Sequence, residues 1–568
     1  MMRSSRFIHG FTSLKIAALL LSVLTLASCG GGGGGNSPVA QPPSNGGGTG
    51  VQPPTRSELQ SAARLLDLAT FGASLEEIEA VAQGGEDAWL TDQFNAPQSS
   101  HLDLVFRYIV EYGIDFTMEP PPGLYRRYAF YEHALTAPDQ LRQLTAYALA
   151  QIFVVSDNID ALAVDPTALS SYYDMLATHA FGNFRDLLRD VTLHPAMGMY
   201  LSHVNNARSN PAANTFPDEN YAREVMQLFS IGLFELNDDG SLRLDNQGQA
   251  IPTYDNTDIR EFAKIFTGLS FGAAESGDPT FFGNRDPVLR VPMVMFDAFH
   301  EPGEKRLLNG QIVPAGQSGL ADIDAAIDNL FNHPNVGPFI GRQLIQRLVT
   351  SNPSPAYVAR VSAAFAGSNG APRGDMQAVL RAILTDPEAR SGIRLREPFR
   401  RYVAMNRSLG ARAADGTVPG AGLVVQFLTG QHVLSAPSVF NFYLPGYRPA
   451  GAIADQNLVA PEFQITDDST IVGVSNLFAI SLFGQESIDS AEGFGPITLD
   501  LADWQARASD LDGLLDDIEL VFFAGQMDAG VREILFDAGA AVTNDLATRL
   551  RLVLFLALSA PDQAVVGN

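Results

Sequence analysis

The chain of 568 residues contains a single cysteine, Cys29, so the sequence excludes an intramolecular disulfide and leaves stability to the apolar core. Positive charge is also scarce, because 37 Lys and Arg stand against 63 Asp and Glu and give a formal net charge of −26. A nucleic-acid-binding protein needs a basic footprint, so this composition argues against nucleic acid as a partner and against docking on anionic lipid. Hydrophobic residues make up 46% of the chain, which is enough for a large core.

Motifs of the best-known chemistries are absent as well. The sequence has no P-loop, no His-Glu-x-x-His, no Cys-x-x-Cys and no Glu-x-x-His of the di-iron type. It also lacks an apolar run long enough for a membrane span, since residues 16–27 and 550–558 fall short of the roughly 20 residues that such a helix needs. No internal repeat is visible. Function therefore has to be sought in local groups of polar residues.

The N-terminus predicts export. A basic stretch precedes the apolar run at residues 16–27, and the run ends in Leu26-Ala27-Ser28-Cys29, which resembles a bacterial lipobox. We expect residues 1–28 to be a lipoprotein signal peptide and Cys29 to be lipidated; the alternative is a plain secretory signal with an unrelated cysteine. Gly30, rather than an aspartate, follows Cys29, so the outer membrane is favoured over the inner one. Contact with the membrane would then run through the lipid anchor only.

After Cys29, residues 29–55 are rich in Gly, Pro, Ser and Asn and predict a flexible tether. Apolar residues then recur at helical spacing, so residues 56–565 predict a single large helical body of the mainly α class, a multi-helix array. The period changes around residues 233–313, where we expect a small β-hairpin insert. Turn signals support it, namely Asn237-Asp238-Asp239-Gly240 and the Asn309-Gly310 pair.

One predicted helix, residues 215–229, concentrates polar side chains on one face. Thr215 is the expected N-cap, and at 100° per residue Glu219, Arg223 and Glu224 lie together, opposite an apolar face. An ordinary surface helix shows the same division, and Glu219 with Arg223 is a common i,i+4 pair. The alternative is a functional site.

Three neighbours of this helix favour a site. A polar loop at residues 202–216 leads into it, Asp258 begins the next charged helix, and His300 follows in a loop with two carboxylates. Polar loops within helical bodies are more often functional than structural. The candidate catalytic residues are therefore Glu219, Arg223, Glu224, Asp258 and His300. No cofactor follows from this set, but a divalent metal held by Glu219, Glu224 and His300 is possible, and so is a general acid–base pair.

Several segments carry a family resemblance. They are Leu65 to Gly72, Glu219 to Glu224, Tyr254 with Asp258 to Gly268, Phe299 to Lys305, and Ala436 to Phe440 with Gly446. In this order, over roughly residues 57–565, the chain resembles the bacterial family called domain of unknown function 1800. Two positions depart from it: Glu301 stands where aspartate is usual, and residues 148–153 replace a helix that often carries tryptophan and histidine.

The resemblance implies an exported protein without an established activity. It also implies a possible partner, because the family's genes often neighbour those of another exported family, domain of unknown function 1501, which resembles sulfatases and alkaline phosphatases. Two functions follow as expectations: a binding or assembly partner of another exported protein, or a metal-dependent or carboxylate-based hydrolase acting on an extracellular polymer. Burial of Glu219, Arg223 and Glu224 across a cleft from His300 would favour the hydrolase, and exposure to solvent would disfavour it.

Overall fold

The computed structural model describes residues 52–111, 122–272, 279–283, 288–368, 370–413, 416, 423–484 and 497–567. Residues 54–568 belong to one compact unit. The expected signal peptide, Cys29 and the tether up to residue 51 lie outside the described residues. None of the described helices is both long and apolar enough to cross a membrane.

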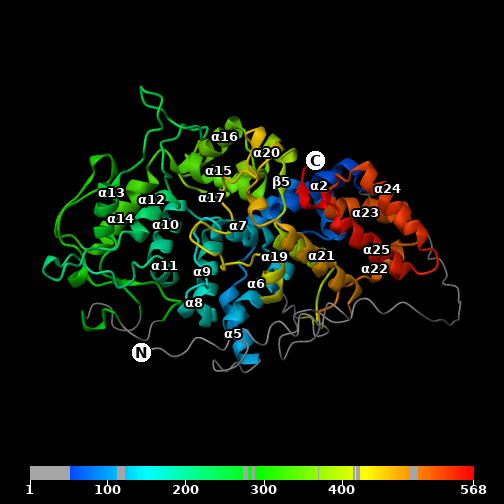
Figure 1. Ribbon diagram of the computed structural model, residues 1–568, viewed down its shortest axis with the longest axis horizontal. Coiled ribbons are helices and arrows are strands. Elements are labelled where there is room, and N and C mark those ends of the chain that lie inside the picture. The colour runs from blue at the N-terminus through cyan, green and yellow to red at the C-terminus, as the bar shows by residue number, and fades with distance from the viewer. Residues whose placement is uncertain are drawn as a thin grey trace, which may run out of the picture. The chain divides into compact units, whose positions relative to one another are not determined.

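The fold is mainly helical, as the periodicity predicts (Figure 1). The helices of the first half are α2 (Arg56–Ala69), α3 (Leu75–Gly84), α4 (Glu86–Asn95), α5 (His101–Glu111), α6 (Tyr125–Thr136), α7 (Gln140–Ala150), α8 (Asp160–Val164), α9 (Pro166–His179), α10 (Phe184–Leu193), α11 (Pro195–Tyr200), α12 (Asn220–Gln227) and α13 (Asn256–Ile265). Those of the second half are α14 (Gly319–Phe331), α15 (Val336–Leu348), α16 (Pro355–Phe365), α17 (Met376–Leu384), α18 (Pro398–Ser408), α19 (Leu423–Thr429), α20 (Ala452–Asp455), α21 (Asp468–Phe483), α22 (Ala502–Arg507), α23 (Leu511–Phe523), α24 (Ala529–Ala541) and α25 (Leu546–Ser559).

Short two-stranded antiparallel sheets complete the described fold. They pair β1 (Leu269–Ser270) with β2 (Val294–Met295), β3 (Lys305–Arg306) with β4 (Ile312–Val313), and β5 (Arg394–Leu395) with β6 (Val565–Val566). The β3–β4 pair confirms the hairpin turn at Asn309 and Gly310, which both have positive φ. The β5–β6 pair, separated by about a third of the chain, has no local sequence signal.

The two ends of the unit meet in space. Helix α2 packs on α23 (Figure 1), and Arg56 forms an ion pair of 2.7 Å with Glu519. Capping boxes mark the start of several helices, for example Thr55 with Glu58 at α2 and Ser74 with Glu77 at α3. Leu65, Ala69 and apolar residues of most other helices form one large core, which holds the surface segments described below in place, and a smaller separate cluster lies around Val105 of α5.

Helix α12 begins later than the sequence predicts. It starts at Asn220, after Glu219, whereas the sequence pattern predicts Thr215 as its N-cap. Thr215 instead pairs with Asn210: the Asn210 N–H donates to the Thr215 carbonyl at 2.9 Å, and the Thr215 N–H donates back at 3.1 Å. Thr215 therefore closes the loop of residues 210–215 by bonding to Asn210, and it does not cap α12. The apolar face is as predicted, with Tyr221 and Val225 buried.

Candidate functional site

Glu219 and Arg223 lie at the solvent-facing side of α12. Their side chains form an ion pair of 3.2 Å and remain 42% and 39% exposed. Glu224, one residue further on, is only 6% exposed, and its Oε2 is buried without a hydrogen-bond partner. Burial raises the pKa of Glu224, while the neighbouring Arg223 charge lowers it, and the net shift is upward. The polar face thus consists of an exposed ion pair, Glu219 with Arg223, and a buried carboxyl, that of Glu224, with one unpartnered oxygen.

Asp258 has a structural task at the start of α13. Its carboxylate accepts the N–H of Asp255 at 2.9 Å, and the Asp255 carboxylate accepts the N–H of Asp258 at 3.2 Å. This reciprocal pair is a capping box, which satisfies backbone donors that the helix leaves free. The geometry explains the acidic residue at this position without a catalytic role.

His300 lies in the interior and not on a cleft. It is 2% exposed, its Nδ1 lies 2.9 Å from the Thr267 carbonyl oxygen, and its Nε2 lies 2.9 Å from Asp322 Oδ2. Lys305 Nζ lies 3.2 Å from the same Nε2 and forms a buried ion pair with Asp322. Both ring nitrogens are therefore occupied by the protein itself. The His300–Lys305–Asp322 group joins the β3–β4 hairpin to α14.

The structure does not bring the candidate metal ligands together. Among the residues that it describes, no three His, Cys, Asp or Glu side chains are grouped so that they could hold a metal ion. Glu219 is engaged by Arg223 and His300 by Asp322, so Glu219, Glu224 and His300 do not form the metal site that the sequence suggested. Glu219 and His300 thus have separate partners in the folded chain, although the sequence pattern grouped them with Glu224.

The polar loop at residues 202–216 is hydrogen-bonded to neighbouring segments at its base and exposed to solvent at its tip. The Asn206 side-chain oxygen accepts the Asp218 N–H at 3.0 Å, and Ser209 donates its N–H to the Glu301 carboxylate at 3.1 Å. Glu301 thus holds this loop beside the His300 segment. His203 is fully buried, stacks on Tyr221 at 4.0 Å and belongs to the core. Residues 210–216 are exposed without interruption, and Ser202, Asn205, Ala207 and Arg208 are exposed as well.

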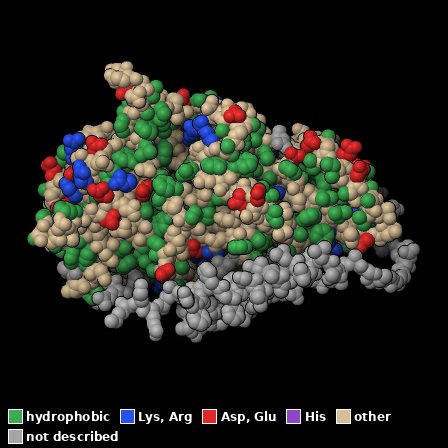
Figure 2. Space-filling view, in the orientation of Figure 1, with side chains coloured by type: hydrophobic (Ala, Val, Ile, Leu, Met, Phe, Trp, Pro, Cys, Tyr) green, Lys and Arg blue, Asp and Glu red, His purple; other side chains and the backbone are tan. Residues whose placement is uncertain are grey.

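A projecting arm at residues 233–253 follows α12. Its three extended segments bond in a ring: Arg243 donates its N–H to Glu235, Glu235 to Ile251, and Ile251 to Arg243, at 2.8, 2.8 and 3.1 Å. The ring leaves no free sheet edge at this level and fixes the shape of the arm. In Figure 1 the arm is the thin loop that rises above α12, and in Figure 2 the same projection stands clear of the surface.

The arm exposes apolar side chains. Leu233, Phe234, Leu242 and Leu244 are 50%, 41%, 50% and 57% exposed. Asn335 anchors the base, because its side chain donates to the carbonyls of Ile231 and Phe234 at 2.8 Å each. Isolated exposed leucines are common, but here four large exposed apolar residues lie within one short element, and apolar surface concentrated in this way is typical of protein interfaces.

The foot of the arm returns to α12. Tyr254, just after the arm, donates its hydroxyl to the Gln227 side chain at 3.2 Å. Burial and the nearby Glu224 charge raise the pKa of Tyr254 to about 12. Glu224 and Gln227 are three residues apart and so share a face of α12. The unpartnered carboxyl of Glu224 therefore lies beside the foot of the arm.

Sequence reasoning missed a buried polar network around Glu397. The Glu397 carboxylate, at the start of α18, accepts from Tyr147 at 3.1 Å, Gln151 at 2.9 Å and Gln431 at 3.2 Å, and from Tyr443. These donors come from distant parts of the chain, so no local pattern could have grouped them. Gln151 directly follows α7, and Tyr443 lies in the irregular segment between α19 and α20.

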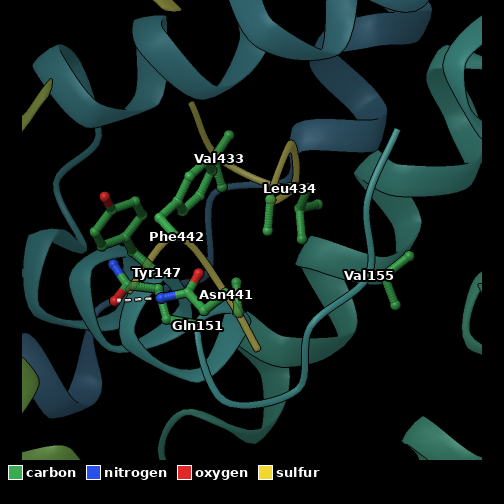
Figure 3. A pocket seen from close by; sticks show the side chains of 9 residues that line it. Tyr147, Gln151, Val155, Val433, Leu434, Asn441 and Phe442 are labelled. Carbon is green, nitrogen blue, oxygen red and sulfur yellow. Dashed lines mark hydrogen bonds between the residues drawn. The ribbon is translucent and has the colours of Figure 1, made fainter. Parts of the chain in front are cut away.

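Beside this network lies a small pocket (Figure 3). Its walls include Gln151, Leu434, Asn441 and Phe442, and the Asn441 amide donates to Gln151 across 3.5 Å. Leu434 and Asn441 both have positive φ, an unfavourable conformation for leucine in particular. The free space holds roughly one water molecule. A polymer chain therefore does not fit this pocket as it stands.

Comparison with known proteins places the chain in a family. The family model described as "Protein of unknown function (DUF1800)" matches residues 64–565, and the chain belongs to this family. The resemblance inferred from the sequence is thereby confirmed. No curated protein and no solved structure matches the chain.

Proposed function

We propose that this protein is an exported lipoprotein of the bacterial cell envelope that acts as a binding or assembly partner of another exported protein. Cys29 would carry the lipid anchor, and Gly30 after it favours the outer membrane. The partner implied by the family resemblance is an exported protein of the family called domain of unknown function 1501. Residues 233–253 would provide the contact surface.

The exposed apolar arm is the observation that carries this proposal. Covering apolar surface releases roughly 25 cal/mol per Å2, so a partner that covers the four side chains gains binding energy that the free protein leaves unused. The hydrogen-bonded ring around Glu235, Arg243 and Ile251 holds the arm in shape before any partner arrives. A pre-shaped surface loses less conformational entropy on binding than a disordered one.

The hydrolase alternative, with a metal or carboxylates acting on an extracellular polymer, has weaker support. Glu219 and Arg223 face solvent as an ion pair, and His300 is 2% exposed with both ring nitrogens engaged. A general base must reach its substrate within hydrogen-bond distance. Glu219 and Arg223 therefore meet the condition that disfavours this alternative, whereas Glu224 is buried and does not.

Binding of the arm can be tested by co-purification. The protein and an exported protein of the family called domain of unknown function 1501 are produced together, and the amount of this second protein retained is measured for wild type and for Leu242→Asp/Leu244→Asp. Charges placed within the apolar contact should weaken binding by roughly 100-fold or more. Ile471→Asp is the matched control, because Ile471 is 48% exposed on α21, away from the arm in sequence.

Equal retention by the arm variant and wild type would exclude the arm as the contact surface. Absence of binding by the wild-type protein itself would contradict the proposed partnership. Circular dichroism and thermal unfolding of each variant establish that the substitutions leave the fold intact.

A further inference from the structure

Glu224 is the charged residue of the predicted polar face that has a buried oxygen without a hydrogen-bond partner. Its residue exposure is 6%, and its Oε2 is sealed from water with no hydrogen bond. Arg223, whose charge acts on Glu224, already forms the ion pair with Glu219, and no ion pair of the described residues includes Glu224. A buried acceptor without a donor lowers the stability of the free protein.

An ionised carboxylate can only accept hydrogen bonds, so its natural complement is a donor that carries positive charge. A metal ion is a poor fit, because Glu224 belongs to no group of three His, Cys, Asp or Glu side chains among the described residues. A lysine ammonium or an arginine guanidinium needs only the one carboxylate. The chemistry of the group therefore points to a cationic side chain.

The surroundings indicate where such a side chain would come from. The arm carries Asp238, Asp239 and Asp245, while its Arg243 is engaged with Glu235 in an ion pair of 2.5 Å. The arm is therefore acidic as well as apolar. A surface complementary to it is apolar with basic residues among or around the apolar ones.

We propose that Glu224 receives a lysine or arginine side chain of the partner that docks on the arm. This inference rests on the proposed function and names the chemistry of the contact. The cation enters beside Tyr254 and Gln227 at the foot of the arm. The four exposed apolar side chains of the arm contact the apolar surface of the partner that adjoins this cation. A second copy of this chain is disfavoured as the partner, because two acidic arms repel each other.

The experiment measures two quantities in the same variants: the affinity for the exported protein used in the co-purification, and the stability of the free protein. Glu224→Gln removes the charge and Glu224→Met removes the polarity at similar volume. Both should weaken binding by roughly 30-fold and reduce its dependence on salt. Glu224→Met should at the same time raise the melting temperature of the free protein by about 1–2 °C, since an unpartnered buried acceptor disappears.

Glu219→Gln is the matched control on the same helix. Its carboxylate is half exposed and already paired, so binding should change by less than about threefold. If Glu224→Met lowers the melting temperature, the carboxyl is structural and the inference is overturned without reference to any partner.

Two further outcomes separate this inference from the proposed function. The arm variant could lose binding while both Glu224 variants bind as the wild type does. This result would support docking on the arm and would contradict the cation site at Glu224. If the protein alone forms a dimer in light scattering that the Glu224 variants abolish, the partner is a second copy, and the assignment to another protein is overturned.

Discussion

Lys305 and Asp322 form a buried ion pair, with exposures of 1% and 0%, beside His300. Removing one member of such a pair leaves a charge in a medium of low polarity, which costs more than the pair itself contributes. We expect Asp322→Asn to lower the free energy of unfolding by about 3 kcal/mol, measured by urea denaturation.

The double variant Lys305→Met/Asp322→Leu is the control for this prediction. It replaces both charges by apolar groups and should recover most of the loss. A double variant less stable than the single one would show that the ion pair itself, rather than the uncompensated charge, decides stability at this site.

Glu462 predicts a dependence on pH. Burial raises its pKa to about 7, with the Glu397 charge acting in the same direction and Arg394 opposing it. The folded state then binds the proton more tightly than the unfolded one, so the stabilising contribution is full below about pH 4.5 and is lost as the pH rises through about 7. A shift of this size corresponds to at most about 3 kcal/mol.

Glu462→Gln should therefore flatten the fall of stability between about pH 5 and pH 8, as urea midpoints at several pH values would show. Glu219→Gln, at a half-exposed position, should leave the profile parallel to that of the wild type. Parallel profiles for Glu462→Gln as well would contradict the assignment of this titration to Glu462.

At the scale of elements, the arm is an addition to the helical body. The two ends of the arm lie side by side, because Thr253 donates its N–H to the Leu233 carbonyl at 3.1 Å. We expect replacement of residues 234–252 by a short Gly-Ser linker to change the melting temperature by no more than a few degrees, because a short loop between adjacent ends closes at low entropic cost. The same deletion should abolish partner binding.

Thermal unfolding and co-purification check the two parts of this prediction separately. The arm touches the helical body at Leu236, which donates its N–H to the Asn335 side chain at 2.9 Å, and at Gly240, which lies against Val358 of α16. A chain that no longer folds without the arm would show that the element belongs to the core and is not a separate recognition device.

At the scale of the whole molecule, the proposed lipid anchor at Cys29 predicts the compartment. Cys29→Ser should abolish incorporation of radiolabelled palmitate and move the protein from the membrane fraction to the soluble one. The physical reason is that acyl chains supply the membrane affinity, at about 0.8 kcal/mol per buried CH2 group. The control is the wild-type protein, fractionated in parallel. A Cys29→Ser protein that stays with the membrane would contradict anchoring through lipid alone.

Family membership and the helical class followed from the sequence, because both depend on signals that are close together in the chain. Apolar residues at helical spacing predict the helices, and Asn309-Gly310 predicts a hairpin turn, since each conformation is set by neighbours within a few residues. The same locality explains why the apolar face of α12, with Tyr221 and Val225, was predicted correctly.

Only the tertiary structure decided what the polar residues do. Asp322, 22 positions after His300, occupies its ring nitrogen, and the donors around Glu397 come from segments as far as 250 residues away. Such partners meet through packing of the core and leave no periodic trace in the sequence. Glu224 shows both sides: helical spacing placed it on a polar face, but only packing buried it without a partner.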